Sequence, residues 1–374
     1  MKILAIETSC DETAISVVEA TENSPSVLSH IVNSQINLHQ KYGGVFPSLA
    51  KREHGKNLVP ALVEALNKAN LYFETNSIEI PTEILETLEK NPELQESFKN
   101  GLGAIKKPEI DYLAVTEGPG LEPALWAGIS FAKALSMLWD IPLIPINHME
   151  GHLASVLLST ENIEFPALAL LVSGGHTELV LASSWGKYQI IGQTLDDAVG
   201  EAFDKVARLL GFPYPGGPQI SRLASKHRKK EKVSAYFKLP RPMLNSDNLS
   251  FSFSGLKTAV RYALEKTEIT LEIQQKMARE FEDAVVEVLV SKTLKALGSY
   301  PAKTLILAGG VSANTYLRKQ LKESLPKDLL YIVPEQHLST DNATMIALAA
   351  YTRIRNNDIS QREIVANGNL RIDS

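Results

Sequence analysis

The feature that most constrains the fold is a unit that occurs in both halves of the chain: a strand, a tight polar turn and a second strand. The strands of the two units are residues 2–7 and 14–19, and residues 165–172 and 177–182. The first pair flanks the polar turn 8–13, and the second pair flanks Ser173-Gly174-Gly175-His176. Such a repeat, with helices between the units, predicts two related α/β lobes that face a cleft.

Two further turns rich in glycine follow buried strands. The strand 111–116 leads into Gly118-Pro119-Gly120 and then a helix over 124–138, and the strand 303–308 leads into the turn 309–314, which opens another helix. Glycine lets the backbone approach a phosphate and present N–H groups to it. We therefore expect a nucleotide cleft between the lobes. The sequence contains neither a Walker motif nor G-x-G-x-x-G, which excludes the P-loop and Rossmann classes.

Composition sets the broad class of protein. A chain of 374 residues accommodates about two domains, and contents of 44% hydrophobic and 22% charged residues are typical of a globular protein. Its apolar runs are too short to span a membrane, and Glu7, Asp11 and Glu12 interrupt any signal-peptide core. The single cysteine, Cys10, permits no internal disulfide. We expect a cytoplasmic protein without a membrane association.

A net charge of −5 argues against a chain that coats nucleic acid over its whole surface. The densest basic run is 226–232, followed by Lys238 and Arg241. Two interpretations stay open: a local nucleic-acid-binding patch, or the solvated face of a helix.

Two histidines four residues apart, His148 and His152, are spaced to lie on one face of a helix. Asp341, at a loop-to-helix junction far along the chain, offers a carboxylate, and three such ligands leave a coordination position open for a substrate. In metalloprotease helices a glutamate directly follows the first histidine. Here Glu150 comes two residues later, about 200° around the helix, which argues against a zinc protease.

Polar residues in the second half are compatible with nucleotide binding. Asp204 lies on a helix expected over 197–210, where it could bind ribose hydroxyls, and the turn 214–218 is rigid. The region 73–107 is different: its apolar spacing predicts two short amphipathic helices. The helices could pack on the chain's own lobe or contact a partner.

Motifs along nearly the whole chain resemble those of the bacterial and organellar enzymes of tRNA N6-threonylcarbamoyladenosine synthesis. This family has the α/β fold of the actin, sugar-kinase and heat-shock ATPase superfamily. The matching stretches are 6–13, 43–50, 117–121, 148–152, 171–177, 200–205, 214–218, 251–258, 308–314 and 340–342. The segment 73–107 is longer than the corresponding connector in the family.

The resemblance implies domains and site residues. It places the N-terminal lobe at 1–146, with the insert 73–107 and a helix over 342–357 that packs back on it, and the C-terminal lobe at 147–341. It assigns one divalent metal, iron with zinc as the alternative, to His148, His152 and Asp341. The substrate-binding residues it implies are Leu171, Val172, Ser173, Gly174, Gly175, Asp204, Gly217 and Asn314.

The implied reaction is an acyl transfer. The threonylcarbamoyl group would pass from threonylcarbamoyl-AMP to N6 of the adenosine 3′ of the anticodon, in tRNAs that read codons starting with A. Asp11 or Glu12, on the first turn, is a candidate for accepting the amine proton. A turn carboxylate that only satisfies nearby backbone N–H groups is the alternative. The implied partners are tRNA, a smaller paralogous subunit, a P-loop ATPase subunit and an upstream adenylate-forming synthase.

Two other classes remain open. A sugar or metabolite kinase of the same superfamily would explain the glycine turns and Asn314, but not the set of His148, His152 and Asp341. A non-catalytic scaffold paralogue would not need the complete set of metal and glycine motifs.

Overall fold

The computed structural model describes residues 1–21, 24–160, 162–231, 236–359 and 362–374. Lys232, the last residue of the expected basic run, lies outside these ranges. The chain forms two compact units: Met1–Glu161 together with Asp341–Ser374, and Asn162–Thr340. The boundary therefore comes after the 148–152 histidine segment, whereas the sequence placed it between 146 and 147. The reason is that this segment packs against the helix that follows Asp341, within the first unit.

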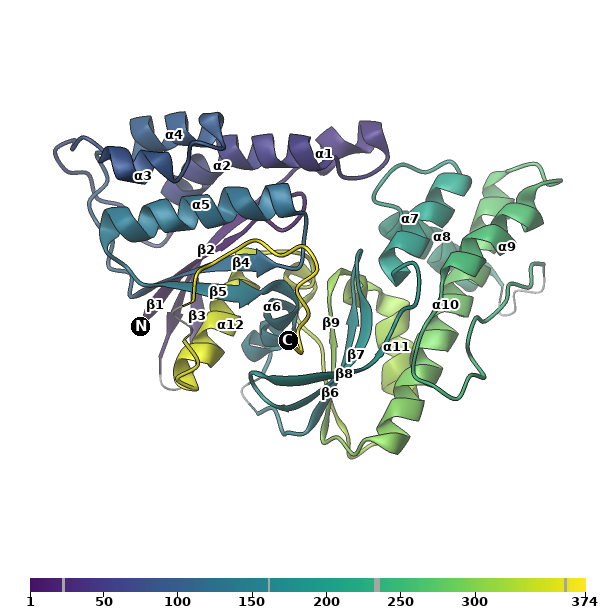
Figure 1. The fold of residues 1–374 in the computed structure, drawn as a ribbon. Helices are drawn as coiled ribbons and strands as arrows, with labels where there is room; N and C mark the ends of the chain where they lie inside the picture. Colours follow the sequence, from purple (N-terminus) through teal and green to yellow (C-terminus); the bar gives the residue numbers. More distant parts are fainter. Residues whose placement is uncertain (22–23, 161, 232–235, 360–361) are drawn as a thin grey trace. The chain divides into compact units, whose positions relative to one another are not determined.

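The first unit is built on a five-stranded mixed sheet of order β3-β2-β1-β4-β5 (Figure 1). Its strands are β1 (Lys2–Glu7), β2 (Glu12–Ala20), β3 (Pro25–Ser34), β4 (Tyr112–Gly118) and β5 (Leu143–Asn147). The first three strands are antiparallel neighbours, and β1, β4 and β5 run parallel. Parallel strands need a crossover, which the helices supply.

Helices cover both faces of this sheet. They are α1 (Ile36–His39), η1 (Gln40–Tyr42), α2 (Pro47–Lys68), α3 (Thr82–Glu86), α4 (Pro92–Leu102), α5 (Glu122–Trp139), α6 (His148–Ala154), η2 (Ser155–Leu158) and α12 (Ala343–Arg355). Helices α2 and α5 pack on one face, while α12 packs against β1 and β2 on the other (Figure 1). Thus both faces of β1 are buried, and its run of apolar residues 3–6 has no exposed side chain.

The region 73–107 forms the two predicted short helices, α3 and α4, and is part of the core of the first unit. Leu94, Phe98 and Leu102 of α4 are buried in the same cluster as the apolar residues of α2, and Ile80 and Ile84 join them. Ring packing of Phe98 against Phe131 of α5 adds a direct contact, with ring centroids 6.0 Å apart. The apolar stripe therefore packs on the chain itself.

The second unit repeats the topology of the first. Its strands are β6 (Ala167–Val172), β7 (Thr177–Ser184), β8 (Lys187–Gln193), β9 (Thr304–Ala308) and β10 (Leu330–Ile332). The sheet order β10-β9-β6-β7-β8 becomes that of the first unit when it is read from β8, with the same pattern of antiparallel and parallel neighbours. The two related α/β units expected from the repeated strand-turn-strand pattern are therefore present.

The helices of the second unit surround a separate core. They are α7 (Val199–Leu209), α8 (Gly217–Lys230), α9 (Ser254–Leu264), α10 (Leu271–Ser299), η3 (Gly310–Ala313), α11 (Thr315–Ser324) and η4 (Gln336–Leu338). The long helix α10 packs against both α8 and α11. Among the helices of the described residues, none has the length and apolar character required to cross a membrane.

Candidate metal centre

Helix α6 brings the two histidines to one side of the first unit. Strand β5 ends at Asn147, whose side-chain oxygen caps the helix by accepting hydrogen bonds from the N–H groups of Met149 at 2.8 Å and Glu150 at 3.4 Å. The cap starts the helix at His148, and His152 follows one turn later on the same face. The ring centroids of the two histidines are 4.7 Å apart.

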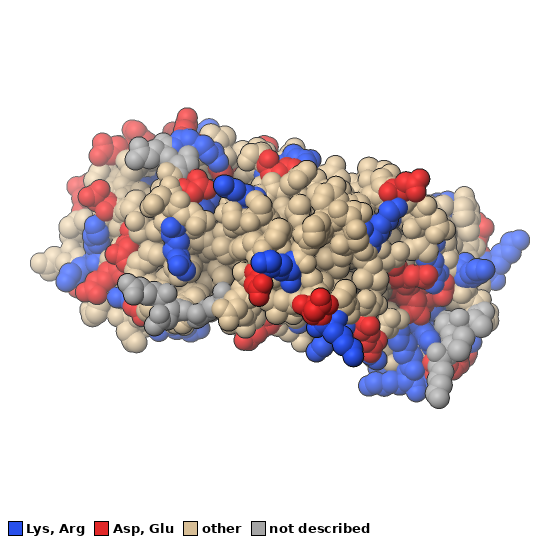
Figure 2. All heavy atoms as spheres, turned by 90° about the horizontal axis from the view of Figure 1, so that it is seen from below, with Lys and Arg blue, Asp and Glu red and all other residues tan. Residues whose placement is uncertain are grey.

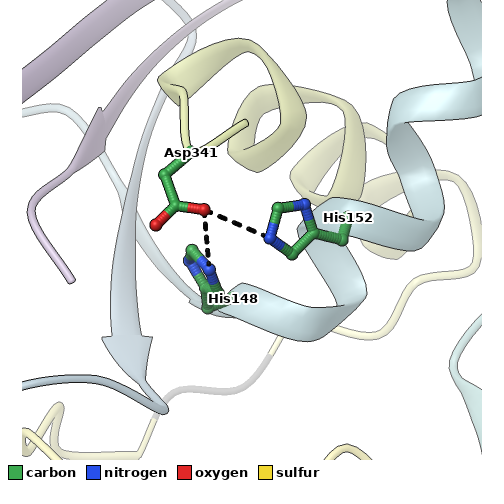
Figure 3. Close-up of side chains that lie close together, drawn as sticks. All are labelled: His148, His152 and Asp341. Atoms are coloured by element: carbon green, nitrogen blue, oxygen red, sulfur yellow. Dashed lines mark ion pairs between the residues drawn. The ribbon is translucent and has the colours of Figure 1, made fainter. Parts of the chain in front are cut away.

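Asp341 completes the cluster from the other end of the sequence. It directly precedes α12, which is capped by Asn342 through a bond from the N–H of Met345 at 3.0 Å. One carboxylate oxygen, Oδ1, lies 3.4 Å from Nε2 of His148 and 3.3 Å from Nε2 of His152 (Figure 3). All three ligand atoms lie within 4.8 Å of one another, an arrangement that can hold a metal ion. The structure thus brings together the residues that the sequence pattern selected.

The two helices that carry these ligands are locked together. A methyl group at Gly151 would lie 2.9 Å from Cδ1 of Ile346 and 3.1 Å from Cγ of Met345, so α6 and α12 pack closely at this glycine. Beside it, the buried carboxylate of Glu150 pairs with Arg353 at 2.7 Å. Glu150 is therefore committed to a structural ion pair, in agreement with its expected direction away from the metal face.

Glu7 orients His148, a role that the sequence alone did not indicate. This fully buried carboxylate at the end of β1 accepts a hydrogen bond from Nδ1 of His148 at 2.9 Å and another from Oγ1 of Thr116 at 2.6 Å. The N–H of Ser9 donates to its other oxygen. A proton on Nδ1 leaves Nε2 of His148 as the ligand atom, which is how outer carboxylates usually orient metal-binding histidines. The available signal was a carboxylate at the end of an otherwise apolar strand.

The electrostatics of the cluster fit a cation. Burial alone would lower the pKa of His148, but the carboxylates of Glu7 and Asp341 outweigh it and raise that pKa well above its usual value. Burial alone would raise the pKa of the Asp341 carboxyl, but the contacts with His148 and His152 hold that pKa well below its usual range. For His152, burial dominates and lowers the pKa.

His152 gives the most direct indication that the cluster is built for a ligand. Its side chain is fully buried, and neither ring nitrogen makes a hydrogen bond to the described residues, although Nε2 lies close to Asp341. Buried polar nitrogens without partners are rare because they lose their hydration without compensation. Coordination of a metal by Nε2 would compensate that nitrogen for its lost hydration.

The turn 8–13 lies next to this cluster. The Oγ of Ser9 is 3.3 Å from Nδ1 of His148. Burial and the charges of Asp11 and Asp341 raise the pKa of the half-buried Glu12 carboxyl well above its usual value. The same three influences, burial first, raise the pKa of the Cys10 thiol. A thiol of raised pKa is a poor nucleophile, whereas a carboxylate of raised pKa is a stronger base than usual.

The turn between β6 and β7 is only partly available to a ligand. Leu171 and Val172 have fully buried side chains, so only their backbone could line a site. The N–H of Ser173 donates to the carbonyl of His176 at 2.8 Å, and its Oγ accepts from the N–H of Gly175 at 3.3 Å. The hairpin turn itself therefore uses the N–H groups of Ser173 and Gly175.

The other implied substrate residues have structural contacts of their own. Asp204 of α7 accepts a hydrogen bond from the N–H of Gly216 at 2.6 Å, which holds the turn 214–218 against that helix, and Gly217 starts α8. Asn314 caps α11, and its Nδ2 donates to Oε1 of the buried Glu282 at 2.7 Å. Asp204 and Asn314 thus also hold the turns next to them.

The turn Gly118-Pro119-Gly120 is covered by the C-terminal segment. The N–H of Gly120 donates to the carbonyl of Gly368 at 3.2 Å, and the N–H of Asn367 donates to the carbonyl of Glu117 at 2.9 Å. The C-terminal segment therefore occupies the space beside the backbone of this turn.

The basic run lies at the end of α8, where one of its members has a structural role. Arg228 pairs with both Glu282 and Asp283 of α10 and stacks on the ring of Tyr316, 3.4 Å from its centroid. Lys226, Lys229 and Lys230 are exposed. On the face drawn in Figure 2, basic and acidic side chains are interspersed and form no large area of one sign.

The comparisons with known proteins agree on one family. A family model described as tRNA N6-adenosine threonylcarbamoyltransferase matches residues 26–78 and 92–348, and so leaves out part of the region 73–107. Relatives of that name from Thermosipho africanus and Persephonella marina are 40% and 42% identical to the chain. The alignments cover 100% of both chains in the first case, and 95% of this chain and 91% of the relative in the second.

Solved structures support the fold. HypF from T. kodakarensis has a TM-score of 0.55 at 12% identity, over 97% of this chain and 48% of HypF. The (R)-2-hydroxyglutaryl-CoA dehydratase component A of Acidaminococcus fermentans has a TM-score of 0.51 at 12% identity, over 95% and 99% of the two chains. This confirms the expected α/β fold class with its duplicated unit.

Proposed function

The chain belongs to the family of tRNA N6-adenosine threonylcarbamoyltransferases, and we propose that His148, His152 and Asp341 hold a divalent metal ion required for this transfer. The observation that carries the proposal is the convergence of three ligand atoms within 4.8 Å. Its membership of this family makes the chain a transferase that modifies tRNA. A kinase that takes up its metal together with a nucleotide would have no use for this cluster.

The metal we propose is iron. A set of two histidines and one carboxylate with open positions is typical of non-haem Fe(II) sites, and Zn²⁺ accepts the same ligands. When bound, the ion would act as a Lewis acid that polarises the carbonyl of the donor. The fixed orientation of His148 by Glu7 would keep the site ready for the ion.

The donor we propose is threonylcarbamoyl-AMP, a mixed anhydride. The N6 amine of the adenosine 3′ of the anticodon attacks the carbamoyl carbon, the bond to the phosphate oxygen breaks, and AMP leaves. The amine is a weak nucleophile because its lone pair is delocalised into the purine, so removal of its proton matters. Glu12 is the better candidate for this base, since the raised pKa of its carboxyl brings it closer to the working pH. Asp11, the neighbouring turn carboxylate, is the second candidate.

We place the adenylate part of the donor on the second unit. Gly174 and Gly175 are exposed and would leave room for a phosphate, because a methyl group built on either would meet nothing within 4 Å. Asp204, Gly217 and Asn314 would hold the nucleoside. Calorimetry with a non-hydrolysable adenylate analogue tests this: Asp204→Asn should weaken binding without loss of metal, and unchanged affinity would contradict the assignment.

For tRNA binding we propose the exposed lysines at the end of α8, Lys226, Lys229 and Lys230. The further partners we propose are a smaller paralogous subunit, a P-loop ATPase subunit and a separate synthase that makes the adenylate. We also propose that the protein acts in the cytoplasm, where it would meet its tRNA substrates.

Nucleoside analysis of tRNA tests the function. Unmodified tRNA is incubated with threonine, bicarbonate, ATP and the partner enzymes, with and without this protein. Modified adenosine should form only with the protein present, in tRNAs that read codons starting with A. The chelated protein and the His152→Ala variant serve as matched controls, and full modification by both would contradict the proposed role of the metal.

A further inference from the structure

A buried chain of polar side chains connects the loop before α2 to the turn 8–13. Its members are Gln35, His39 and His54, which are 5%, 0% and 0% exposed. Burying this many polar groups is costly unless each of them is hydrogen-bonded.

The hydrogen bonds between these side chains all run in one direction, from Phe46 to Cys10. At one end, the N–H of Phe46 can only donate, and it does so to Nδ1 of His39 at 3.3 Å. Nε2 of His39 must then carry the proton that it donates to Oε1 of Gln35 at 3.1 Å. At the other end, the carbonyl of Cys10 can only accept, and it faces Nε2 of His54 at 3.0 Å.

The donors and acceptors between these two ends follow from the assignments at the ends. Because Nε2 of His54 carries the proton, Nδ1 must accept, and it lies 2.8 Å from Oγ1 of Thr13 and 3.3 Å from Nε2 of Gln35. Both of those atoms can donate. His54 is thereby held in a single neutral tautomer, and burial lowers the pKa of its side chain to about 4, which agrees with this assignment.

His54 binds both sides of the turn that carries the candidate bases. Cys10 precedes Asp11 and Glu12, and Thr13 follows them, so contacts to Cys10 and Thr13 bracket the two carboxylates. Gln35 adds a third contact, because its backbone N–H donates to the carbonyl of Asp11 at 2.9 Å. At the start of the same turn, Ser9 touches His148.

We propose that His54 is a positioning residue for the transfer reaction, which fixes the backbone of the turn 8–13 so that its carboxylates stand in place beside the metal centre. This inference rests on the proposed role of Glu12 or Asp11 as the base. His54 itself touches no metal ligand among its hydrogen-bond partners, and its action goes through the turn.

The substitutions His54→Gln, His54→Asn and His54→Leu separate positioning from simple packing. Glutamine can place its amide nitrogen near the position of Nε2 and keep the donation to Cys10, whereas asparagine is too short and leucine has no donor. Leu62→Ala, a buried core change in the same helix α2, serves as a control for loss of stability alone. Melting temperature, bound metal, and kcat and KM for tRNA are measured for each full-length variant, with the partner proteins present.

We expect His54→Asn and His54→Leu to lose about 100-fold in kcat, the range seen when positioning of reacting groups is disturbed, with unchanged KM and metal content. His54→Gln should recover most of kcat, and Leu62→Ala should lower only the melting temperature. Wild-type kcat in folded His54→Leu would overturn the proposal, and so would a loss of kcat that follows a loss of metal. If Glu12 and Asp11 variants retain full activity while His54→Leu does not, the base assignment fails instead.

Discussion

The carboxylate of Glu7 accepts a hydrogen bond from Nδ1 of His148 at 2.9 Å, which joins the end of the first strand to the first ligand of the candidate metal centre. The two residues are far apart in the sequence, and both are buried. A buried carboxylate in this position both fixes the tautomer of the histidine and raises its basicity.

Replacing Glu7 with glutamine should therefore weaken metal binding by about 10- to 100-fold, because the neutral amide no longer favours the required proton on Nδ1. Titration with Fe²⁺ or Zn²⁺ in competition with a chelator measures the change. Thr116→Val is the matched control, since it removes the second hydrogen bond to the same oxygen but keeps the carboxylate. Equal affinity in Glu7→Gln and the wild type would contradict the assigned role.

Folding stability should depend on pH through His54. The pKa of this side chain is lowered by burial from 6.5 to about 4 in the folded protein. Between these values the unfolded chain binds a proton that the folded chain does not, so stability present above pH 6.5 is lost as the pH falls towards 4. The full loss is about 3 kcal/mol. Urea unfolding at several pH values should show a smaller dependence for His54→Gln than for the wild type; identical slopes would rule out this contribution.

Charge reversal on α8 should have two different effects. Changing Lys226, Lys229 and Lys230 to glutamate should weaken tRNA binding and lower its salt dependence, by about one unit of slope for each lost phosphate contact. Changing Arg228 to glutamate should mainly destabilise the second unit, because it faces Glu282 and Asp283. Measuring tRNA binding by both variants from 50 to about 200 mM salt distinguishes the two effects. A salt slope unaltered by the lysine changes would restore the interpretation as a solvated helix face.

The region 73–107 should be required for folding. Phe98→Ala should cost about 3–5 kcal/mol, because it leaves a cavity in the core of the first unit. The control Phe73→Ala concerns a side chain that is 56% exposed and should change stability by less than about 0.5 kcal/mol. Chemical denaturation measures both. A Phe98 variant as stable as the wild type would mean that α4 is dispensable for the core.

The sequence predicted several buried strands and the turns that follow them, but it did not predict every element. The buried strands that became β1, β4, β6 and β9 are continuous apolar runs, and the turns after them contain glycine or polar residues. Strand β8 was not predicted, because its residues 187–193 are mostly half-buried and polar. The duplication itself was visible because the same strand-turn-strand unit occurs twice.

The candidate site was predictable where its residues are close in sequence or match the family's motifs. The spacing of His148 and His152 by itself places both side chains on one face of a helix. The role of Glu7, in contrast, could be assigned only once β1 and α6 were placed side by side. Arg228 was grouped with exposed lysines because the sequence does not show which helix faces α8. The coverage of Gly118-Pro119-Gly120 by the C-terminal segment is likewise a tertiary contact without a local signal.

Metal content measured together with transfer activity tests the metal centre most directly. The wild type, His148→Ala, His152→Ala and Asp341→Ala are purified without added nucleotide, and iron and zinc are quantified in each. Each variant should bind metal far more weakly than the wild type and lose transfer activity, while its melting curve shows a folded protein. Wild-type metal content in all three variants would contradict the assignment of these residues as the metal ligands.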